Sequence, residues 1–288
     1  MRKGTVIGSG MRKSTVIGPG MRKSTVIALV VLVVALGTVA YAATQLSAAK
    51  KAYTEGNAAY EDLRGQVKTV SVPASDSSTT KTAFGANDLS MVVELVPRVY
   101  IPPLEIDFEA LQSINDDAVA WLYCPDTVID YPVMRAADYD RYLYRLPDGT
   151  YNVNGSLFID YNNAPDFSDR LTVIYGHHMQ SKAMFGSLVG YKSQRYFDEF
   201  PYLYLYTEQG NYRIDLIYGC VIAAGQWRER AFMYSENVDS LLAYAAHNTT
   251  FASDVVCMPD DRIVVLSTCS YEFNDARYVV IGVLRSEF

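Results

Sequence analysis

The spacing of apolar residues changes along this chain, and each kind of spacing predicts a different element. Val26–Ala43 is an 18-residue run without a charge. At about 1.5 Å per residue, such a helix spans a hydrocarbon core of about 30 Å. Residues 45–69 repeat apolar side chains at roughly helical spacing among Lys and Glu, which predicts a helix. Residues 70–90 are polar and without periodicity, which is typical of a flexible linker.

The rest of the chain alternates short apolar runs with turn residues such as Pro125-Asp126 and Gln209-Gly210. Asp107 is expected to cap a short helix that runs through Gln112. Further helices are expected near 182–189, 192–199 and 237–247. Many short strands with few helices predict a β-barrel or a β-sandwich. The expected strands are 118–123, 128–134, 155–160, 171–176, 202–206, 212–223, 262–268 and 277–285.

Composition agrees with one β-rich domain that carries appendages. Half of the 288 residues are hydrophobic, which is enough for one substantial core. The 23 Tyr and 11 Phe favour strands, because aromatic side chains suit pleated, half-buried surfaces.

Charge around the apolar run predicts how the chain meets a membrane. Three copies of a ten-residue unit that begins MRK precede the run and supply all six cations there, without an acid. The repeat is interpreted as a recent duplication or an early start codon. The positive-inside rule then places the N-terminus in the cytoplasm and the remainder outside. The alternative is a cleaved signal peptide, since Ala40-Tyr41-Ala42 resembles a cleavage site. We favour an uncleaved anchor, because the run exceeds the usual hydrophobic region of about 7–15 residues.

The part of the chain after the anchor is strongly acidic. Without the six N-terminal cations it holds 19 basic and 32 acidic residues. Such a domain would repel phosphate backbones, so nucleic-acid binding is not expected.

Four cysteines are too few, and too irregularly placed, for a disulfide scaffold. Cys124 and Cys220 lie in apolar runs and are expected inside the core, whereas Cys257 precedes a turn. Cys269 follows the apolar run 263–266 at the expected end of a strand. No spacing among the four indicates a zinc site.

Cys269 is the candidate nucleophile for covalent acyl chemistry. A thiolate attacks a carbonyl, and a fixed cation or hydrogen-bond donor stabilises the oxyanion that forms. Arg277 lies eight residues further on, on the next expected strand, and His177 and His178 end another apolar run. Any of these could instead be structural, because a cysteine in an apolar strand is by default a small hydrophobic residue.

Several motifs resemble one enzyme family, the sortases. LSTCSYEFNDAR, which begins at Leu266, resembles their TLxTC…R signature. INDDAVAWLYCPDTVIDYPVM, GSLFIDYNNAPDFSD, TVIYGHHM and MFGSL resemble class B specifically, in the order of that family. The resemblance covers about Phe108 to Leu284. Two positions depart from it: Cys124 and Asp126 stand where relatives tend to have an aliphatic residue and Gly.

The resemblance implies an eight-stranded sortase-type β-barrel with peripheral helices, preceded by one transmembrane helix. The expected organisation is a cytoplasmic basic segment (1–24), an anchor (25–44), a helical spacer and linker (45–90) and a catalytic domain (91–288). It also implies a helix before the seventh strand, which the 237–247 segment fits.

The resemblance further implies roles for individual residues. Cys269 would be the nucleophile, His177 the proton-transfer residue because it follows Gly directly, and Arg277 the oxyanion donor. Adjacent strand residues point to opposite faces, so His178 is expected to turn away from Cys269. Candidate substrate-binding residues are Ser267, Thr268, Tyr271 and Glu272. For Arg277, the alternative is a salt bridge to Asp275 or Glu272.

The implied function is transpeptidation at the cell surface. A class B-like sortase would cleave the C-terminal sorting signal of secreted proteins and transfer them to an amine of the cell wall or of a peptidoglycan precursor. Two alternatives remain: a pilin-polymerising sortase, and a catalytically silent wall-binding module of the same fold. No cofactor or metal is expected, because the acidic pairs Asp116-Asp117 and Asp166…Asp169 lack the spacing of a calcium loop.

Overall fold

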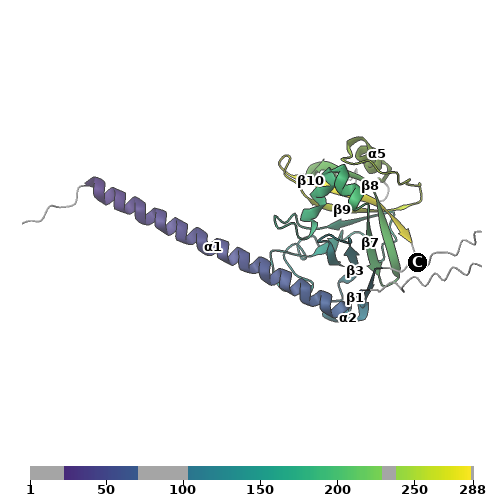
Figure 1. Ribbon diagram of the computed structural model, residues 1–288, viewed down its shortest axis with the longest axis horizontal. Coiled ribbons are helices and arrows are strands. Elements are labelled where there is room, and N and C mark those ends of the chain that lie inside the picture. Colours follow the sequence, from purple (N-terminus) through teal and green to yellow (C-terminus); the bar gives the residue numbers. More distant parts are fainter. Residues whose placement is uncertain (1–22, 71–102, 229–237, 287–288) are drawn as a thin grey trace, which may run out of the picture. The chain divides into compact units, whose positions relative to one another are not determined.

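The computed structural model describes residues 23–70, 103–228 and 238–286 (Figure 1). Most of the predicted basic segment (1–24) and of the predicted linker (70–90) lies outside these residues. The chain divides into two compact units between Lys51 and Ala52.

The first unit consists of the N-terminal part of helix α1 (Lys23–Val67). Its large apolar side chains are exposed, for example Ile27 at 64% and Val39 at 67%. An 18-residue window of the helix has a mean hydropathy of 2.4, so it is long and apolar enough to cross a membrane. The predicted membrane segment therefore coincides with a candidate membrane-spanning helix.

The second unit contains a closed eight-stranded β-barrel with the strand order β10-β8-β7-β3-β4-β5-β6-β9. Six of the eight neighbouring pairs are antiparallel, and the pairs β4–β5 and β6–β9 are parallel. The predicted barrel is confirmed. Its strands are β3 (Ala118–Tyr123), β4 (Asp130–Met134), β5 (Leu157–Ile159), β6 (Leu171–Tyr175), β7 (Tyr202–Thr207), β8 (Gly210–Ala223), β9 (Arg262–Cys269) and β10 (Ala276–Ser286).

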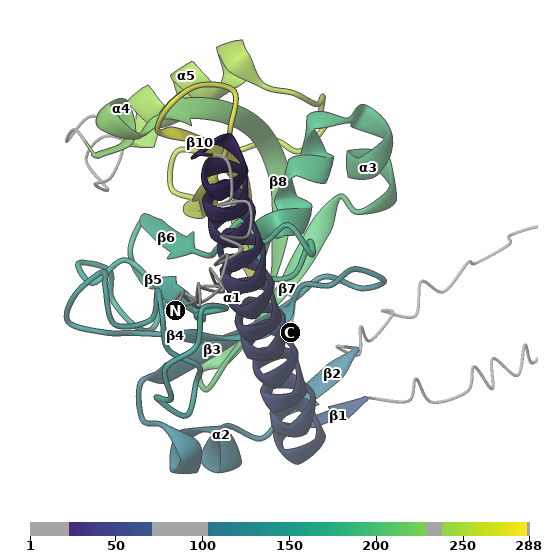
Figure 2. The same ribbon diagram turned by 90° about the vertical axis from the view of Figure 1, so that its left-hand side faces the viewer.

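Short helices occupy the connections, close to where the sequence places them. Asp107 accepts a hydrogen bond from Ala110 N and so caps the first of them, as predicted. The helix expected at 182–189 is a 3₁₀-helix that begins three residues later. The helices are α2 (Phe108–Ile114), η1 (Phe185–Lys192), α3 (Gln194–Glu199), α4 (Ala224–Arg228) and α5 (Val238–Asn248). Figure 2 shows α4 and α5 together, next to β8 and β10.

Strand alternation divides the barrel residues between the interior and the outer face. On β9, Val264 and Leu266 belong to the interior core, to which all eight strands contribute. Ile263 and Val265 lie on the outer face, in a second core cluster with residues of α5. Cys269 continues the odd-numbered series, so its side chain is directed to the outer face.

The last turns of α1 belong to the barrel unit. Leu63 and Val67 pack in a third core cluster with Leu104 of β2 (Leu104–Ile106) and Leu111 of α2. Strand β1 (Lys68–Val70) follows the helix directly and pairs antiparallel with β2 (Figure 2). Apolar burial on one side of the helix therefore fixes residues 52–67 against the barrel.

Polar contacts reinforce this docking. Tyr60 is buried and its hydroxyl donates to Gly155 O at 2.6 Å, while Asn152 Nδ2 donates to Ala52 O at 2.9 Å. Gly56 lies where the helix comes closest to the barrel, because a Cβ there would overlap the side chains of Asn152 and Asn154. The residues predicted as part of a membrane-proximal spacer thus share a compact unit with the barrel from Ala52 onward.

Candidate active site

Cys269 is the last residue of β9, where the strand emerges from the core. The preceding residues Ile263 to Thr268 are buried, whereas Cys269 is partly exposed. A partly exposed thiol at a strand end is accessible to a substrate while its main chain remains fixed by the sheet.

The other three cysteines occupy environments that disfavour a thiolate. Burial raises the pKa of Cys124 to about 11 and that of Cys220 to about 12. Cys257 is partly exposed, and desolvation followed by the nearby Asp261 carboxylate raises its pKa. Deprotonated sulfur is the nucleophile, so none of these three is suited to acyl transfer near neutral pH.

Arg277 lies directly opposite Cys269 on the neighbouring antiparallel strand β10. Ser270 N donates to Ala276 O at 2.9 Å, which makes the adjacent Cys269–Arg277 position a non-hydrogen-bonded pair. In such pairs the Cα atoms are only about 4.5 Å apart and the side chains share one face of the sheet. The predicted cation is thereby brought beside the thiol.

The guanidinium of Arg277 forms no ion pair with any residue that the structure describes. Its Nη1 donates to Ala276 O at 3.2 Å. The alternative of a salt bridge to Asp275 or Glu272 is not found among the described residues, since Glu272 pairs with Lys192 instead. Arg277 therefore retains hydrogen-bond donors for another group.

Strand β6, which ends just before the two histidines, runs parallel to β9. Tyr175 of β6 pairs with Ser267, so His177 and Cys269 each lie two residues beyond the last paired position. The residue between β6 and His177 must be a glycine, because a Cβ on Gly176 would lie 2.5 Å from Leu157 Cδ2. The parallel register therefore brings the Gly-His motif and the cysteine to the same end of the barrel.

The side chain of His177 has two described contacts. Its Nε2 donates to Leu143 O at 2.5 Å, and its ring centroid lies 6.0 Å from that of Tyr144. Because a carbonyl oxygen only accepts, Nε2 carries the proton and Nδ1 is the nitrogen available for proton transfer. Among the hydrogen bonds of the described residues, none joins this imidazole to Cys269 Sγ.

The prediction that His178 turns away from Cys269 is wrong. Its Nδ1 lies 2.7 Å from the main-chain oxygen of Cys269, and its ring centroid lies 4.9 Å from that of Tyr271. The alternation argument fails because β6 ends at Tyr175. Residues beyond a strand end no longer follow its two-residue period.

Two of the four predicted substrate-binding residues directly precede the cysteine, and they differ in role. Ser267 is buried on the outer-face series of β9, and its Oγ has no hydrogen-bond partner among the described residues. Buried polar atoms normally have a partner, so this unpaired hydroxyl is an exception. Thr268 is buried and donates through Oγ1 to Gly176 O at 2.8 Å, which is a structural contact.

The other two candidates follow Cys269 in the connection to β10. Tyr271 is 75% exposed. Glu272 accepts hydrogen bonds from Lys192 and Ser270. Burial tends to raise the pKa of Glu272, but these two bonds outweigh it and lower the pKa to about 2. Glu272 thus fixes this connection, a role that its sequence position did not indicate.

Two contributors to the site were missed by sequence reasoning. Lys192 of η1 holds Glu272 and donates to Ser270 Oγ at 3.1 Å, and Leu143 holds His177 through its main chain. Lys192 is 80 residues from Glu272 in the chain, and Leu143 is 34 residues from His177. Only the fold brings them together, and a main-chain acceptor has no sequence signature.

The acidic pairs considered for calcium are engaged with neighbouring groups. Asp117 Oδ2 accepts from the Tyr142 hydroxyl at 2.6 Å, and Asp169 Oδ2 accepts from Asn163 Nδ2 at 2.9 Å. Within the described residues, no group of three or more His, Cys, Asp or Glu side chains could hold a metal ion.

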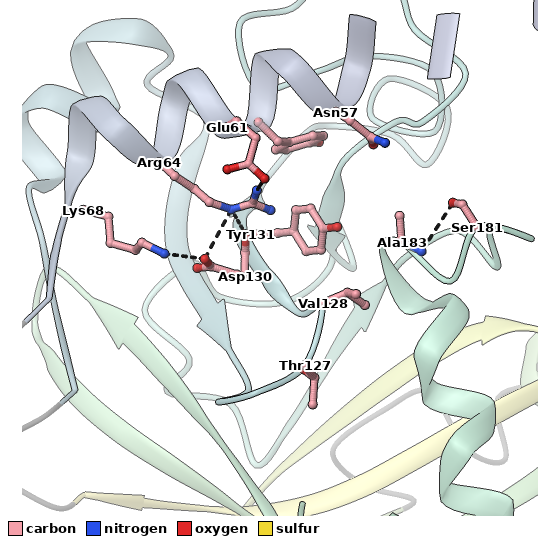
Figure 3. A pocket seen from close by; sticks show the side chains of 11 residues that line it. Asn57, Glu61, Arg64, Lys68, Thr127, Val128, Asp130, Tyr131, Ser181 and Ala183 are labelled. Atoms are coloured by element: carbon pink, nitrogen blue, oxygen red, sulfur yellow. Dashed lines mark hydrogen bonds and ion pairs between the residues drawn. The ribbon is translucent and has the colours of Figure 1, made fainter. Parts of the chain in front are cut away.

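The residues that line a cavity of about 440 Å³ do not include Cys269, Arg277 or either of the two histidines (Figure 3). It is lined by the last turns of α1, the turn between β3 and β4, and the 181–183 loop. Its charges compensate one another: Arg64 pairs with Glu61 at 2.9 Å, and Lys68 pairs with Asp130. The cavity thus has no unpaired charge that would select a ligand.

Sequence comparison identifies two curated relatives that share most of their length with this chain. Sortase B of Listeria monocytogenes is 32% identical over 178 residues, which cover 60% of this chain and 72% of that protein. Sortase B of Staphylococcus aureus is 27% identical over 178 residues, covering 61% and 73% respectively. No family model matches the sequence.

Solved structures agree with this similarity. The Staphylococcus aureus sortase B–substrate complex aligns with a TM-score of 0.57 and 26% identity, over 62% of this chain and 84% of that one. A sortase B complexed with triglycine aligns with the same TM-score and identity over 62% and 85%. A class B sortase of Streptococcus pyogenes that is involved in pilus biogenesis aligns with a TM-score of 0.56 and 28% identity, over 62% and 98%.

Proposed function

Because the chain belongs to the class B sortases, a family of cysteine transpeptidases, we propose that it cleaves C-terminal sorting signals and joins the cleaved proteins to a cell-wall amine. The observation that supports this most directly is the Cys269–Arg277 pair, which joins the end of β9 to the start of β10. The parallel strand β6 leads His177 to the same end of the barrel.

Cys269 acts as the nucleophile in this proposal. Its thiolate attacks the carbonyl carbon of the scissile peptide bond and forms a tetrahedral oxyanion. When the oxyanion collapses, the C–N bond breaks and a thioester links the substrate to Sγ. Arg277 donates hydrogen bonds to the oxyanion, a role for which its donors are available.

His177 transfers protons in both halves of the reaction. It gives a proton to the departing amine when the peptide bond breaks, and it takes one from the incoming amine that attacks the thioester. Cys269 then leaves as the thiolate, which regenerates the free enzyme. The contact of Nε2 with Leu143 O supports the use of Nδ1 for these transfers.

The acceptor is proposed to be an amine of the cell wall or of a peptidoglycan precursor. Structures of related sortase B proteins bound to a substrate and to triglycine support a peptide donor and an amine acceptor. Of the candidate substrate contacts, the exposed Tyr271 is the one whose accessibility supports the role.

Incubating the protein with sorting-signal peptides tests this proposal, with adduct mass and cleavage rate as readouts. The parent should form an adduct on Cys269 and release the C-terminal fragment, and Cys269→Ala should do neither. His177→Ala should be nearly as inactive, with non-additive losses in the double variant because both residues act as a unit. An adduct on Cys257, or full activity of Cys269→Ala, would overturn the assignment. Absence of any adduct in the parent would favour the silent wall-binding module.

The neighbour involved in pilus biogenesis supports a second candidate, a sortase that polymerises pilins. The two candidates differ in the acceptor, which is a lysine of another pilin subunit rather than a wall amine. Offering triglycine and a lysine-containing pilin peptide in competition distinguishes them, because the mass of the ligated product identifies the amine that was used.

The apolar part of α1 is proposed to anchor the enzyme with its N-terminus in the cytoplasm and the barrel outside. The six cations before the apolar run Val26–Ala43 support this orientation. The protein should stay with membranes after a high-salt wash, and protease added outside intact cells should remove the barrel. Release by salt, or a mature N-terminus at Ala43, would contradict the anchor.

A further inference from the structure

The parallel pairing of β6 with β9 ends one step before the candidate catalytic residues. Its last main-chain hydrogen bond runs from Gly176 N to Ser267 O at 3.1 Å. In a regular parallel ladder, the next two bonds would run from Cys269 N to Gly176 O and from His178 N to Cys269 O. Neither occurs among the main-chain hydrogen bonds of the described residues outside the regular elements.

Two side chains make the corresponding bonds. Thr268 Oγ1 donates to Gly176 O at 2.8 Å, and His178 Nδ1 donates to Cys269 O at 2.7 Å. Each side chain reaches the same carbonyl that the regular ladder would have used. Since a carbonyl oxygen only accepts, Nδ1 of His178 carries a proton.

The strand on the other side of β9 does not satisfy the carbonyl of Cys269. Cys269 faces Arg277 in a non-hydrogen-bonded pair, so its carbonyl points toward β6 instead of β10. Without His178, the carbonyl oxygen of Cys269 would have no hydrogen-bond donor among the described residues. Main-chain polar groups in such positions normally acquire a partner.

His178 is itself held in place on two sides. Its main chain forms an isolated bridge with Met184, and its ring packs at 47° against that of Tyr271. The bridge to Met184 anchors the main chain of His178 independently of β9, so the bond from its imidazole to Cys269 O restrains the strand end and not merely the histidine.

We propose that His178 is a positioning residue for the nucleophile: its Nδ1–H fixes the carbonyl of Cys269 and, through it, the direction of Sγ. The inference rests on the proposed function, in which Sγ must meet a substrate carbonyl next to Arg277. It differs from a general-base role because Nδ1 keeps its proton in both charge states of the ring.

Three substitutions in the full-length, detergent-solubilised protein test this inference. His178→Asn places an amide N–H close to the position of Nδ1 and cannot titrate, whereas His178→Ala removes the donor. His247→Ala, at the exposed C-terminal end of α5, is the matched histidine control. Measurements are kcat and KM for a sorting-signal peptide across pH, and amide hydrogen exchange of the 266–276 segment without peptide.

His178→Ala should lower kcat by about 10- to 10²-fold with little change in KM, since small misplacements of reacting groups have effects of this size. It should also speed amide exchange in the 266–276 segment. His178→Asn should restore most of the rate with an unchanged pH profile, and His247→Ala should match the parent.

Parent-like turnover and exchange in His178→Ala would overturn the inference. So would a His178→Asn variant that folds but is as slow as His178→Ala, or one that loses a limb of the pH profile, because both would require the imidazole itself. If His178→Ala does not fold, the His178→Asn result decides alone. Full activity of Cys269→Ala would instead refute the proposed function, while the exchange measurement would still report on the restraint.

Discussion

The two neighbours of β9 deliver their candidate catalytic residues in different ways. On one side, β10 pairs with β9 in a continuous antiparallel register from Arg262↔Leu284 to Cys269↔Arg277. On the other side, β6 stops pairing at Tyr175↔Ser267, and His177 lies beyond the regular strand. The cation is thus placed by main-chain pairing alone, whereas the histidine depends on a loop.

The position of Arg277 should therefore tolerate substitutions nearby, whereas the position of His177 should be sensitive to them. The register of β9 and β10 is set along the whole antiparallel ladder, so the Cys269–Arg277 pairing does not depend on the side chains of these two residues alone. The His177 segment is instead held by particular contacts, namely Gly176 against Leu157 and the imidazole against Leu143 O. Substitutions should therefore affect chemistry on the β10 side, and both chemistry and stability on the β6 side.

The largest effect is expected on the β10 side. Arg277→Lys keeps the charge but loses the planar fork that donates two hydrogen bonds at once. Losing one oxyanion donor lowers kcat by about 10²–10³-fold, and the melting temperature should not change. Arg285→Lys, on the same strand, is the matched control and should turn over like the parent. Parent-like kcat in a folded Arg277→Lys variant would remove Arg277 from the oxyanion site.

A smaller effect is expected from Gly176→Ala on the β6 side. The new Cβ would lie 2.5 Å from Leu157 Cδ2 and 2.7 Å from Phe185 Cδ2, so the segment must shift. Overpacking of this kind destabilises by about 1–3 kcal/mol, and displacement of His177 should lower kcat by about 10²-fold. Gly225→Ala, where a Cβ meets nothing within 4 Å, is the control for kcat and for chemical denaturation. Loss of stability without loss of kcat would show that His177 does not depend on this packing.

The smallest effect concerns the connection between β9 and β10. The lowered pKa of Glu272, about 2 against an ordinary 4.5, means that its charged form stabilises the folded state. The contribution is present above about pH 4.5 and is lost as the pH falls to about 2. Because the Lys192–Glu272 pair is about one-third exposed, we expect no more than about 1 kcal/mol.

Glu272→Gln should therefore lower the free energy of unfolding slightly at pH 7 and flatten its decline between pH 4.5 and 2. Chemical denaturation across pH measures this, with Glu208→Gln in the exposed turn between β7 and β8 as the control. An unchanged acid dependence in Glu272→Gln would mean that the ion pair does not stabilise the connection.

The sequence predicted the barrel well because each strand carries its own signal. Apolar runs bounded by turn residues identified all eight strands to within two residues at each end. The Asp107 cap was also predictable, since an N-cap acts on main-chain donors a few residues away. The 3₁₀-helix was placed less accurately, because such helices have a weak periodic signal.

Contacts around the site were predicted less completely. The sequence placed Cys269 and Arg277 on successive strands, and the structure shows that they pair directly. The predicted orientation of His178 was wrong because it applied strand alternation to a residue beyond the strand end, which the sequence had placed at residue 176 and the structure places at Tyr175. The contact between Lys192 and Glu272 was not predicted, because the two residues are 80 positions apart and nothing in the sequence around Lys192 indicates its partner.

The sequence by itself determined the apolar helix, the strands and the motif residues, since these depend on local periodicity and composition. The tertiary structure alone decided which of two adjacent histidines bonds the main chain of Cys269, that Ser267 has an unpaired buried hydroxyl, and that Glu272 is held by Lys192. The physical reason is range: periodicity reports which face a residue occupies within its own element. A hydrogen bond between elements requires the position of both, and only the packed barrel fixes it.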